Sequence, residues 1–310
     1  MKNILIIKHG SLGDIISATS VLKDIRDHYI NDKIIILTTN KFKNFFLESP
    51  FVNNVLVDNR EGLVKSLIIL SKIIKLKVDL IIDLQNTRRT NLYEFLFRLF
   101  TIAEINGTGI FATKRYKNIY SELPSVVDGL SNQIEKLGIK TTRTPFLEWL
   151  MNKPFDWSKI SNKRFMIINP GCSINNDQKK WSEKKYAEIC DFLNSKNILP
   201  ILIGSVIDKE SIDFINKNTT NVVNLCNQSP LNVVYQISKK AIGAISNDTG
   251  PAHLIAASGC KIHLVLSSFS NVYTVIPKTP NVTFTQKNNI NEISSEEIIK
   301  EIKKNMIYEY

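Results

Sequence analysis

Residues 4–14, ILIIKHGSLGD, decide how the first half of this chain folds. The apolar run Ile4 to Ile7 ends in a loop with two glycines, and the segment after Asp14 has the apolar spacing of a helix. A buried parallel strand that enters a glycine-bearing loop and then a helix is the opening unit of a Rossmann-like fold. Such loops often bind phosphate through free N–H groups. The carboxylate of Asp14 would repel phosphate, so this loop needs another purpose.

The same strand and helix rhythm continues along the chain, and it predicts parallel sheets with right-handed crossovers. In the first half, strands are expected at residues 4–8, 33–38, 54–58 and 80–84, with helices at 15–29, 63–76 and 92–100. In the second half, strands are expected at 164–170, 198–204, 221–225, 241–246 and 261–266, with helices at 183–194, 209–216, 232–239 and 251–257.

The second half opens like the first, because FMIINPGCS (165–173) is again a strand that runs into a glycine loop. An irregular stretch with two prolines and two tryptophans, around residues 141–162, separates the halves. We therefore expect two doubly wound domains, 1–150 and 151–310, that face a cleft, with ligands at the carboxyl ends of the strands. A last helix at about 294–306 begins with a capping pattern, and packing of this helix back on the N-terminal domain is an option.

Composition excludes several classes of protein. The chain has 310 residues, of which 43% are hydrophobic, and a net charge of +11 that is spread over both halves. No basic arm of the nucleic-acid-binding kind stands out, whereas a basic surface suits a phosphorylated substrate or an anionic membrane; compositional bias is the alternative. Four cysteines without Cys-x-x-Cys spacing favour reduced thiols in the cytoplasm. The apolar runs are too short for a signal sequence or a membrane span.

Five segments, in this order, resemble glycosyltransferase family 9, the ADP-heptose:lipopolysaccharide heptosyltransferases. They are ILIIKHGSLGDIISATSVL (4–22), LIIDLQNTRR (80–89), INPGCS with KKWSEKKYAEIC (168–190), ILIGSVIDKE (201–210) and AISNDTGPAHLIAASG (244–259). The resemblance implies a GT-B architecture, with two Rossmann-like doubly wound domains that face a cleft. It also implies that the C-terminal domain binds the nucleotide-sugar donor and the N-terminal domain binds the acceptor.

The resemblance implies an inverting transfer of heptose from ADP-heptose to a lipopolysaccharide inner-core acceptor. Asp14 would be the general base, since a carboxylate within hydrogen-bond reach of a sugar hydroxyl makes it a better nucleophile. From the residues alone, Asp14 is equally well explained as a cap of the helix that follows. We expect the acceptor to contact Gly13. Because an acidic glycolipid core needs cations, we also expect it to contact Arg60, Arg88 and Arg115, which follow or flank strand ends of the first domain, although any one arginine is as well explained as an ordinary surface residue.

The stretch SNDTGPAHL (246–254) is the stronger phosphate signal. The N–H groups of Thr249 and Gly250 precede a helix that Pro251 starts, and this is a common anion site. Asp248 is expected either to cap the loop or to contact the transferred sugar. His253, one turn into the helix, either faces the cleft or packs against the neighbouring strand.

The remaining donor contacts are expected from NPGCS and KKW. Gly171, Cys172 and Ser173 form the turn after the first C-terminal strand, where they would hold phosphate oxygens. Lys179 matches the family's lysine two residues before tryptophan and would neutralise the leaving diphosphate, a role that Mg²⁺ often fills. A solvated Lys179–Lys180 pair is the alternative. No Asp-x-Asp and no histidine spacing for a metal occur, so no metal cofactor is expected.

Asp208 and Glu210 would reach the ribose or adenine edge of the nucleotide, or they are simply acids at the start of a helix. After strand 261–266, the family pattern has a glycine and a proline in the loop, whereas SSFSNVYTVIP (267–277) has neither until Pro277. The shape of the sugar pocket, and therefore the identity of the transferred sugar, stays open. The expected partners are a nucleotide sugar and a lipopolysaccharide core glycolipid, with no nucleic acid. The expected location is the cytoplasm, with peripheral contact at the inner face of the inner membrane as an option.

Three other functions stay open. The same fold serves transfer from another nucleotide sugar or to another glycan. A nucleotide-sugar-binding protein without turnover is disfavoured by Asp14 together with Lys179. A Rossmann dehydrogenase is disfavoured because GSLGD (10–14) lacks the Gly-x-Gly-x-x-Gly spacing.

Overall fold

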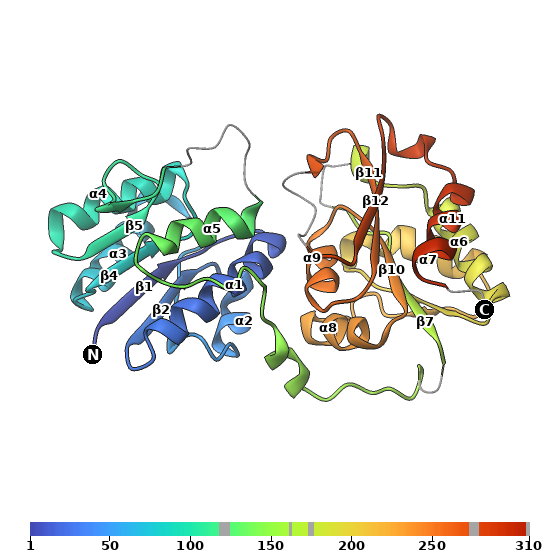
Figure 1. Cartoon of the computed structure of the whole chain (residues 1–310), viewed down its shortest axis with the longest axis horizontal. Helices are drawn as coiled ribbons and strands as arrows, with labels where there is room; N and C mark the ends of the chain where they lie inside the picture. Colours follow the sequence, from blue (N-terminus) through green and yellow to red (C-terminus); the bar gives the residue numbers. More distant parts are fainter. Residues whose placement is uncertain (118–124, 161–162, 173–176, 273–278, 308–310) are drawn as a thin grey trace. The chain divides into compact units, whose positions relative to one another are not determined.

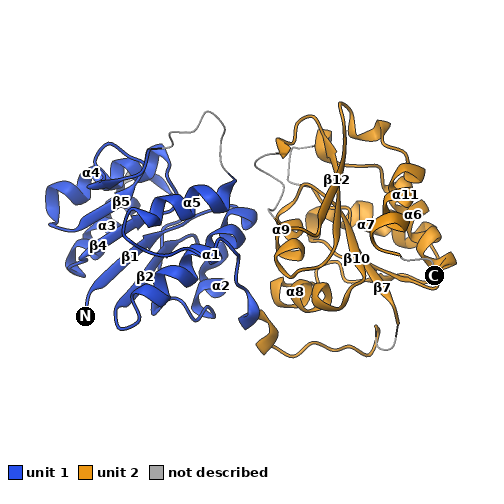
Figure 2. Cartoon of the chain, in the orientation of Figure 1, with its two compact units in different colours: residues 1–149 blue, residues 150–310 orange. Residues whose placement is uncertain are grey.

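The computed structural model describes residues 1–117, 125–160, 163–172, 177–272 and 279–307 (Figure 1). The chain divides into two units, Met1–Trp149 and Leu150–Tyr310 (Figure 2). Each unit contains one six-stranded sheet, and the strand pairs of both sheets are parallel. The expected α/β architecture of two Rossmann-like units is therefore confirmed.

The sheet of unit 1 has the order β3-β2-β1-β4-β5-β6. Its strands are β1 (Asn3–Ile7), β2 (Lys33–Thr38), β3 (Asn54–Val57), β4 (Leu80–Asp83), β5 (Glu104–Gly107) and β6 (Lys114–Arg115). The chain runs outward from β1 to β3 and then crosses back to β4, so the strand order reverses between β1 and β4. The carboxyl ends at such a reversal are where open α/β sheets bind ligands.

The helices of unit 1 are α1 (Leu12–His28), α2 (Lys43–Leu47), α3 (Gly62–Lys75), α4 (Arg88–Phe100) and α5 (Val126–Glu135). On one face of the sheet, Leu5 and Ile7 pack with Ile73 of α3 and Phe97 of α4. The expected start of α1 at residue 15 was wrong, because Ser11 caps the helix and Leu12 is its first residue. Apolar periodicity marks the part of a helix that is buried, whereas the polar cap decides where it begins.

The sheet of unit 2 has the order β12-β11-β10-β7-β8-β9 and reverses between β7 and β10. Its strands are β7 (Phe165–Asn169), β8 (Leu199–Leu202), β9 (Val223–Asn224), β10 (Gly243–Asn247), β11 (Ile262–Ser267) and β12 (Val282–Lys287). The sequence analysis did not predict β12. This strand is only partly buried and lies at the sheet edge, so it lacks the continuous apolar run that marks the central strands.

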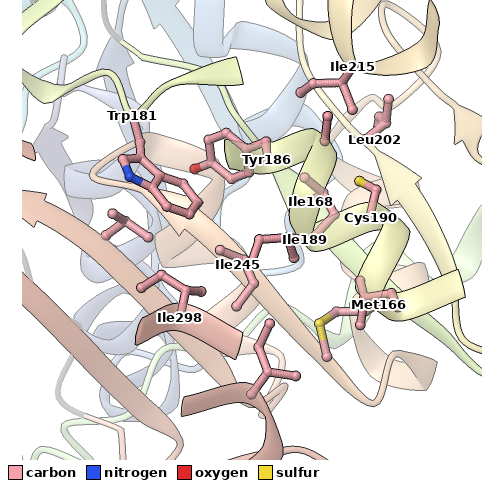
Figure 3. Packing of buried hydrophobic residues seen from close by; sticks show 14 of the residues in the cluster. Met166, Ile168, Trp181, Tyr186, Ile189, Cys190, Leu202, Ile215, Ile245 and Ile298 are labelled. Atoms are coloured by element: carbon pink, nitrogen blue, oxygen red, sulfur yellow. The ribbon is translucent and has the colours of Figure 1, made fainter. Parts of the chain in front are cut away.

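The helices of unit 2 are α6 (Glu183–Ser195), α7 (Lys209–Asn218), α8 (Leu231–Lys240), α9 (Gly250–Ala257) and α11 (Ser295–Asn305). Figure 3 shows part of the core on one face of the sheet, where the rings of Trp181 and Tyr186 meet edge to face with centroids 4.9 Å apart. Ile298 and Ile302 of α11 join this core. The last helix thus packs within unit 2, and the indole of Trp181 donates to the Ile293 carbonyl just before it (3.0 Å).

Short 3-10 helices complete the described chain: η1 (Asn40–Phe42), η2 (Glu148–Asn152), η3 (Asp177–Lys179), η4 (Val206–Asp208) and η5 (Ile290–Glu292). Aromatic residues anchor both ends of the connection between the units. Trp149 packs against Phe51 in unit 1, whereas Trp157 packs against Phe155 and under the ammonium of Lys240 in unit 2. Among the helices that the structure describes, none is both long enough and apolar enough to cross a membrane.

Candidate functional site

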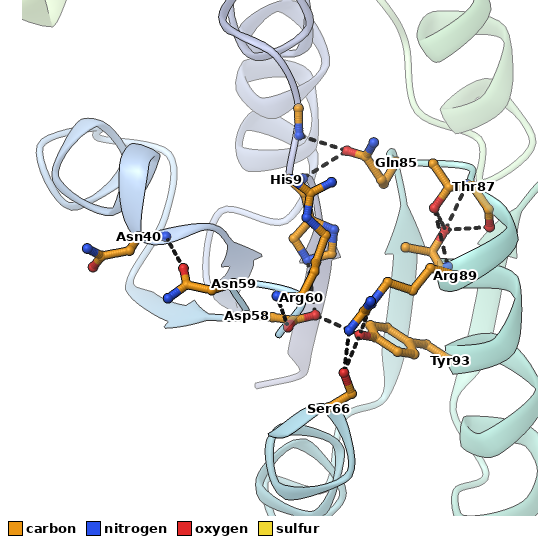
Figure 4. Close-up of polar contacts among 12 residues, drawn as sticks. His9, Asn40, Asp58, Asn59, Arg60, Ser66, Gln85, Thr87, Arg89 and Tyr93 are labelled. Atoms are coloured by element: carbon orange, nitrogen blue, oxygen red, sulfur yellow. Dashed lines mark hydrogen bonds and ion pairs between the residues drawn. The ribbon is translucent and has the colours of Figure 1, made fainter. Parts of the chain in front are cut away.

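In unit 1, loops that follow different strands meet at the carboxyl edge of the sheet (Figure 4). The backbone N–H groups of His9 and Gly10, which follow β1, both donate to Oε1 of Gln85 at 2.9 Å. Gln85 follows β4, so this contact joins the two strands at which the order reverses. A side chain from one loop therefore fixes the backbone of the other where a ligand is expected to bind.

A buried polar network lies beside this contact. Nε2 of His9 is 3.5 Å from Oδ2 of Asp58, which follows β3. The same oxygen accepts a hydrogen bond from the hydroxyl of Tyr93 (2.7 Å), and that hydroxyl accepts one from Nε of Arg89 (2.8 Å). Arg60 stands beside Asp58 and donates its backbone N–H to Oδ1 (2.8 Å). We call these five residues, His9, Asp58, Arg60, Arg89 and Tyr93, the unit 1 cluster.

The charge of the unit 1 cluster is set by burial. His9 is almost fully buried, and this burial is the main cause that lowers its pKa to about 4; Asp58 acts in the opposite direction, and Arg60 and Arg89 act in the same direction. His9 is therefore a neutral imidazole at neutral pH. The cluster then holds two guanidinium groups and one carboxylate, an excess of positive charge that favours an anionic ligand.

Asp14 takes part in the cap of α1. Its Oδ2 accepts hydrogen bonds from the backbone N–H and the hydroxyl of Ser11, both at 3.0 Å, and its own N–H donates to that hydroxyl. The capping role is thus present, as one of the two interpretations expected. Among the described residues, both bonds to this carboxylate go to Oδ2. The buried ammonium of Lys8 attracts Asp14 as well as Asp83.

The expected acceptor residues occupy different places. Gly13 is buried in the first turn of α1, and Arg88 is exposed as the first residue of α4. Arg115 is also exposed and donates from Nε to the Thr108 carbonyl (3.1 Å). The contact with Tyr93 in the cluster belongs to Arg89, the neighbour of Arg88.

Sequence reasoning missed most of the unit 1 cluster. The sequence does indicate part of the cluster, because His9 and Asp58 are polar residues at the ends of predicted strands. The i, i+4 spacing of Arg89 and Tyr93 was a second signal, since residues four apart lie on one side of a helix.

In unit 2, amides hold together the loops that follow β7 and β10. Asn169 Nδ2 donates to the hydroxyls of Ser246 and Thr249, both at 2.8 Å. Asn247 Nδ2 donates to the carbonyls of Pro170 (3.0 Å) and Gly171 (3.1 Å). Because β7 and β10 flank the reversal in this sheet, the two loops expected to hold phosphate are adjacent. The sequence analysis did not single out Asn169 or Asn247.

A cation is held next to these loops. Nζ of Lys179 lies 2.7 Å from Oδ2 of Asp248, and the Ser270 hydroxyl donates to the same oxygen (2.9 Å). Both charged side chains are partly buried, with 22% and 13% exposed for Lys179 and Asp248. The alternative of a fully solvated lysine pair is therefore wrong for Lys179. Ser270, which the sequence analysis did not single out, lies in the loop that departs from the family pattern.

The start of α9 presents backbone donors at the same place. Thr249 is the N-cap residue and its backbone is extended, so the helix begins at Gly250 with Pro251 next. The first N–H groups of a helix have no partner within it, which makes this end suitable for an anion. His253 lies half-buried one turn further along α9.

Asp208 connects the loops after β7 and β8. Its carboxylate accepts from the backbone and hydroxyl of Ser205 (2.9 Å each) and from the N–H of Cys172 (3.3 Å). A Cβ at Gly171 would lie 2.8 Å from Oδ1 of Asp208, so a larger residue here would displace the Asp208 carboxylate. Glu210 is exposed in the first turn of α7. Ser173 lies outside the described residues. Within the described residues, no group of three or more His, Cys, Asp or Glu is placed to hold a metal ion.

Comparison with known proteins places these two sites in context. The model of glycosyltransferase family 9 (heptosyltransferase) matches residues 112–293. The lipopolysaccharide core heptosyltransferase OpsX of Haemophilus influenzae is 22% identical over 282 residues, which cover 84% of this chain and 78% of OpsX. Lipooligosaccharide heptosyltransferase 2 of Campylobacter jejuni is 25% identical over 256 residues, 79% of this chain and 74% of that protein.

Solved structures show the same fold. The glycosyltransferase family 9 protein of Veillonella parvula has a TM-score of 0.82 at 18% identity, with 99% of this chain and 97% of that chain covered. The E. coli heptosyltransferase WaaC, solved with ADP, has a TM-score of 0.78 at 17% identity, with 98% and 99% covered. At such identities the likeness concerns the fold alone.

Proposed function

This chain belongs to glycosyltransferase family 9, and from that premise we propose that it transfers a heptose from ADP-heptose to a lipopolysaccharide core acceptor with inversion at the anomeric carbon. The names of its relatives support the sugar and the acceptor. ADP in the structure of a relative with the same fold supports the nucleotide. The observation that carries the proposal is the Lys179–Asp248 pair, because it places a cation beside the start of α9.

The donor would bind to unit 2. Backbone N–H groups of Thr249 and Gly250 and of the 171–173 turn would hold the diphosphate oxygens. Lys179 is paired with Asp248 before the donor arrives, so its ammonium would be shared with, or passed to, the leaving phosphate. A positioned cation stabilises the charge that develops as the sugar–phosphate bond breaks. Asp208 would act through Cys172 and Gly171, whose loop it holds in place.

The acceptor would bind to unit 1. The guanidinium groups of Arg60 and Arg89 would contact its acidic groups, since arginine pairs well with carboxylate and phosphate. Asp14 would take the proton of the attacking hydroxyl on Oδ1 while Oδ2 keeps its bonds to Ser11. The hydroxyl oxygen forms the new bond to the anomeric carbon, the bond to the ADP phosphate breaks, and a single displacement inverts the configuration.

Transfer from a different nucleotide sugar is the second candidate. It is favoured by the loop after β11, where Ser270 contacts Asp248 and the family's glycine and proline are replaced. The enzyme would act in the cytoplasm at the inner face of the inner membrane, because its acceptor is a glycolipid.

Thermal shift with equal concentrations of ADP, UDP, GDP and NAD tests the donor, since a ligand that binds only the folded state raises Tm. ADP should give the largest shift. Mass spectrometry of a core acceptor incubated with ADP-heptose should then show the added heptose. Equal shifts for all four nucleotides, or a preference for NAD, would overturn the ADP assignment.

A further inference from the structure

The outer face of the α3–α4 layer is unusually apolar for a surface. Val64, Leu67 and Ile68 of α3 are 72%, 56% and 51% exposed, while Ile69, Leu70 and Ile73 of the same helix are buried in the core. A helix that is apolar on both sides is normally covered on both. The inner side of α3 packs on the sheet of unit 1, and no described residue of unit 1 buries Val64, Leu67 or Ile68 on its outer side.

Helix α4 extends this apolar surface. Leu92, Leu99 and Phe100 are exposed on it, and the ring of Phe95 packs against Phe111 of the loop after β5 (centroids 4.9 Å apart). The two helices are in contact at their first turns, where Nη2 of Arg89 donates to the Ser66 hydroxyl (2.6 Å). We refer to the exposed side of α3 and α4 as the α3–α4 face. Exposed apolar residues gathered on two neighbouring helices are typical of an interaction site.

The exposed charges on this face are mostly positive. Residues 61–104 contain seven Lys and Arg against five Asp and Glu. Asp83 and Glu94 are buried, Asp79 and Glu104 lie outside both helices, and the exposed Glu61, which precedes α3, pairs with Lys65. On α3 the exposed cations Lys65, Lys72 and Lys75 alternate with the exposed apolar residues. Apolar side chains interleaved with lysine are the composition of a surface that lies on anionic lipid.

We propose that the α3–α4 face docks this protein on an anionic lipid bilayer, with the apolar side chains at the acyl boundary and the lysines among the phosphate headgroups. A second copy of the chain is a poor occupant, because a two-fold interface would place the same lysines opposite each other, and the exposed acid at the start of α3, Glu61, is already paired with Lys65. Docking here deepens the proposed function, whose acceptor is a membrane glycolipid. The starts of α3 and α4, which supply Ser66 and Arg89, adjoin the unit 1 cluster.

Flotation of the full chain with lipid vesicles tests the proposal. The chain should float with vesicles of phosphatidylcholine mixed with phosphatidylglycerol, bind phosphatidylcholine alone much more weakly, and lose binding at high salt. The double variant Lys72→Glu/Lys75→Glu should bind the anionic vesicles roughly 30-fold more weakly, given the contribution of each lysine near such a surface. Lys43→Glu, on α2, is the matched control and should bind as the wild type does.

A second pair of variants tests the apolar contribution. Leu67→Glu/Ile68→Glu should lower binding to anionic vesicles by about tenfold or more. Leu47→Glu changes an equally exposed leucine on α2 and should leave binding intact. All three side chains are exposed, so an unchanged Tm verifies that each variant is folded. Binding by Leu67→Glu/Ile68→Glu equal to that of the wild type would overturn the proposal.

Two other outcomes would also overturn it. The first is that the wild-type chain binds no vesicle at all. The second is that vesicles do not bind while Leu67 and Ile68 are needed for another interaction, either a concentration-dependent dimer or the capture of an acidic protein. Failure of the proposed function can be distinguished from failure of membrane docking, because vesicle binding requires no sugar transfer. If both proposals hold, the variants transfer normally to a delipidated acceptor and more slowly to an acceptor embedded in vesicles.

Discussion

The ammonium of Lys179 and the carboxylate of Asp248 are 69 residues apart in the chain and 2.7 Å apart in the folded unit 2. The pair has no net charge, whereas a diphosphate in the proposed donor site would bring negative charge to the neighbouring start of α9. Donor binding there would redistribute the hydrogen bonds of this pair. The Ser270 hydroxyl, which donates to Asp248, would keep its bond when Lys179 turned to the phosphate.

Lys179→Ala should weaken ADP binding by roughly 10- to 100-fold, because it removes a charge-assisted contact to phosphate and leaves Asp248 to repel it. Isothermal titration calorimetry measures the change. Lys180→Ala is the matched control and should bind ADP almost as the wild type does. Equal affinity of Lys179→Ala and wild type would remove Lys179 from the donor site.

Asp14→Asn should lower kcat by a factor on the order of 10² to 10⁴, because the amide retains the size of the side chain but cannot take a proton. Binding of ADP should survive, since the proposed donor site lies in unit 2. Ser11→Ala is the control: it removes the cap and costs about 1 kcal/mol of stability, but it retains the base. Near-normal turnover of Asp14→Asn at saturating substrates would leave Asp14 with the capping role alone.

Two adjacent arginines allow a sharp test of the acceptor site. Arg89→Ala should raise the acceptor KM by about tenfold, because Arg89 lies in the unit 1 cluster and arginine contacts to acidic groups contribute on this scale. Arg88→Ala should have a smaller effect, since Arg88 is exposed outside that cluster. Initial rates at varied acceptor concentration measure both. A larger effect of Arg88→Ala would place the acceptor elsewhere on unit 1.

The buried carboxyl group of Glu94 should make the stability of the fold depend on pH. It is fully buried, and burial, followed by the charge of Asp83, raises the pKa of Glu94 from 4.5 to about 7. Between these two values the folded chain holds a proton that the unfolded chain has lost. The contribution of Glu94 to the free energy of unfolding should therefore fall as the pH rises from about 4.5 to 7 and then level off.

Glu94→Gln should abolish this fall, because the amide has no proton to lose. Its stability relative to the wild type should improve by something on the order of 2–3 kcal/mol between pH 5 and pH 8. Urea unfolding at the two pH values measures it. Glu104→Gln, which changes an exposed carboxylate on β5, should show no such gain. If the stabilities of Glu94→Gln and the wild type change in parallel with pH, Glu94 is ionised in the fold.

The two parallel sheets, and the loops that follow their central strands, were predictable from the sequence. Runs such as Ile4 to Ile7 are apolar on both faces, and only a strand covered by helices on both sides suits such a run. The sequence also pointed to Asp14, Lys179 and the 246–254 loop, through a family resemblance carried by short motifs. These features are local, because hydrophobic periodicity and turn residues act over a few positions.

Tertiary structure alone decided which side chains meet. His9 reaches Asp58 because β2 and β3 pair beside β1 in the sheet, and that order is not encoded in any one strand. Arg89 rather than Arg88 contacts Tyr93, since consecutive helical residues point about 100° apart and only packing fixes the rotation of α4. The edge strands β6 and β12 form because a neighbour pairs with them. Contacts between loops depend on strand order and helix rotation, which arise only when the whole unit packs.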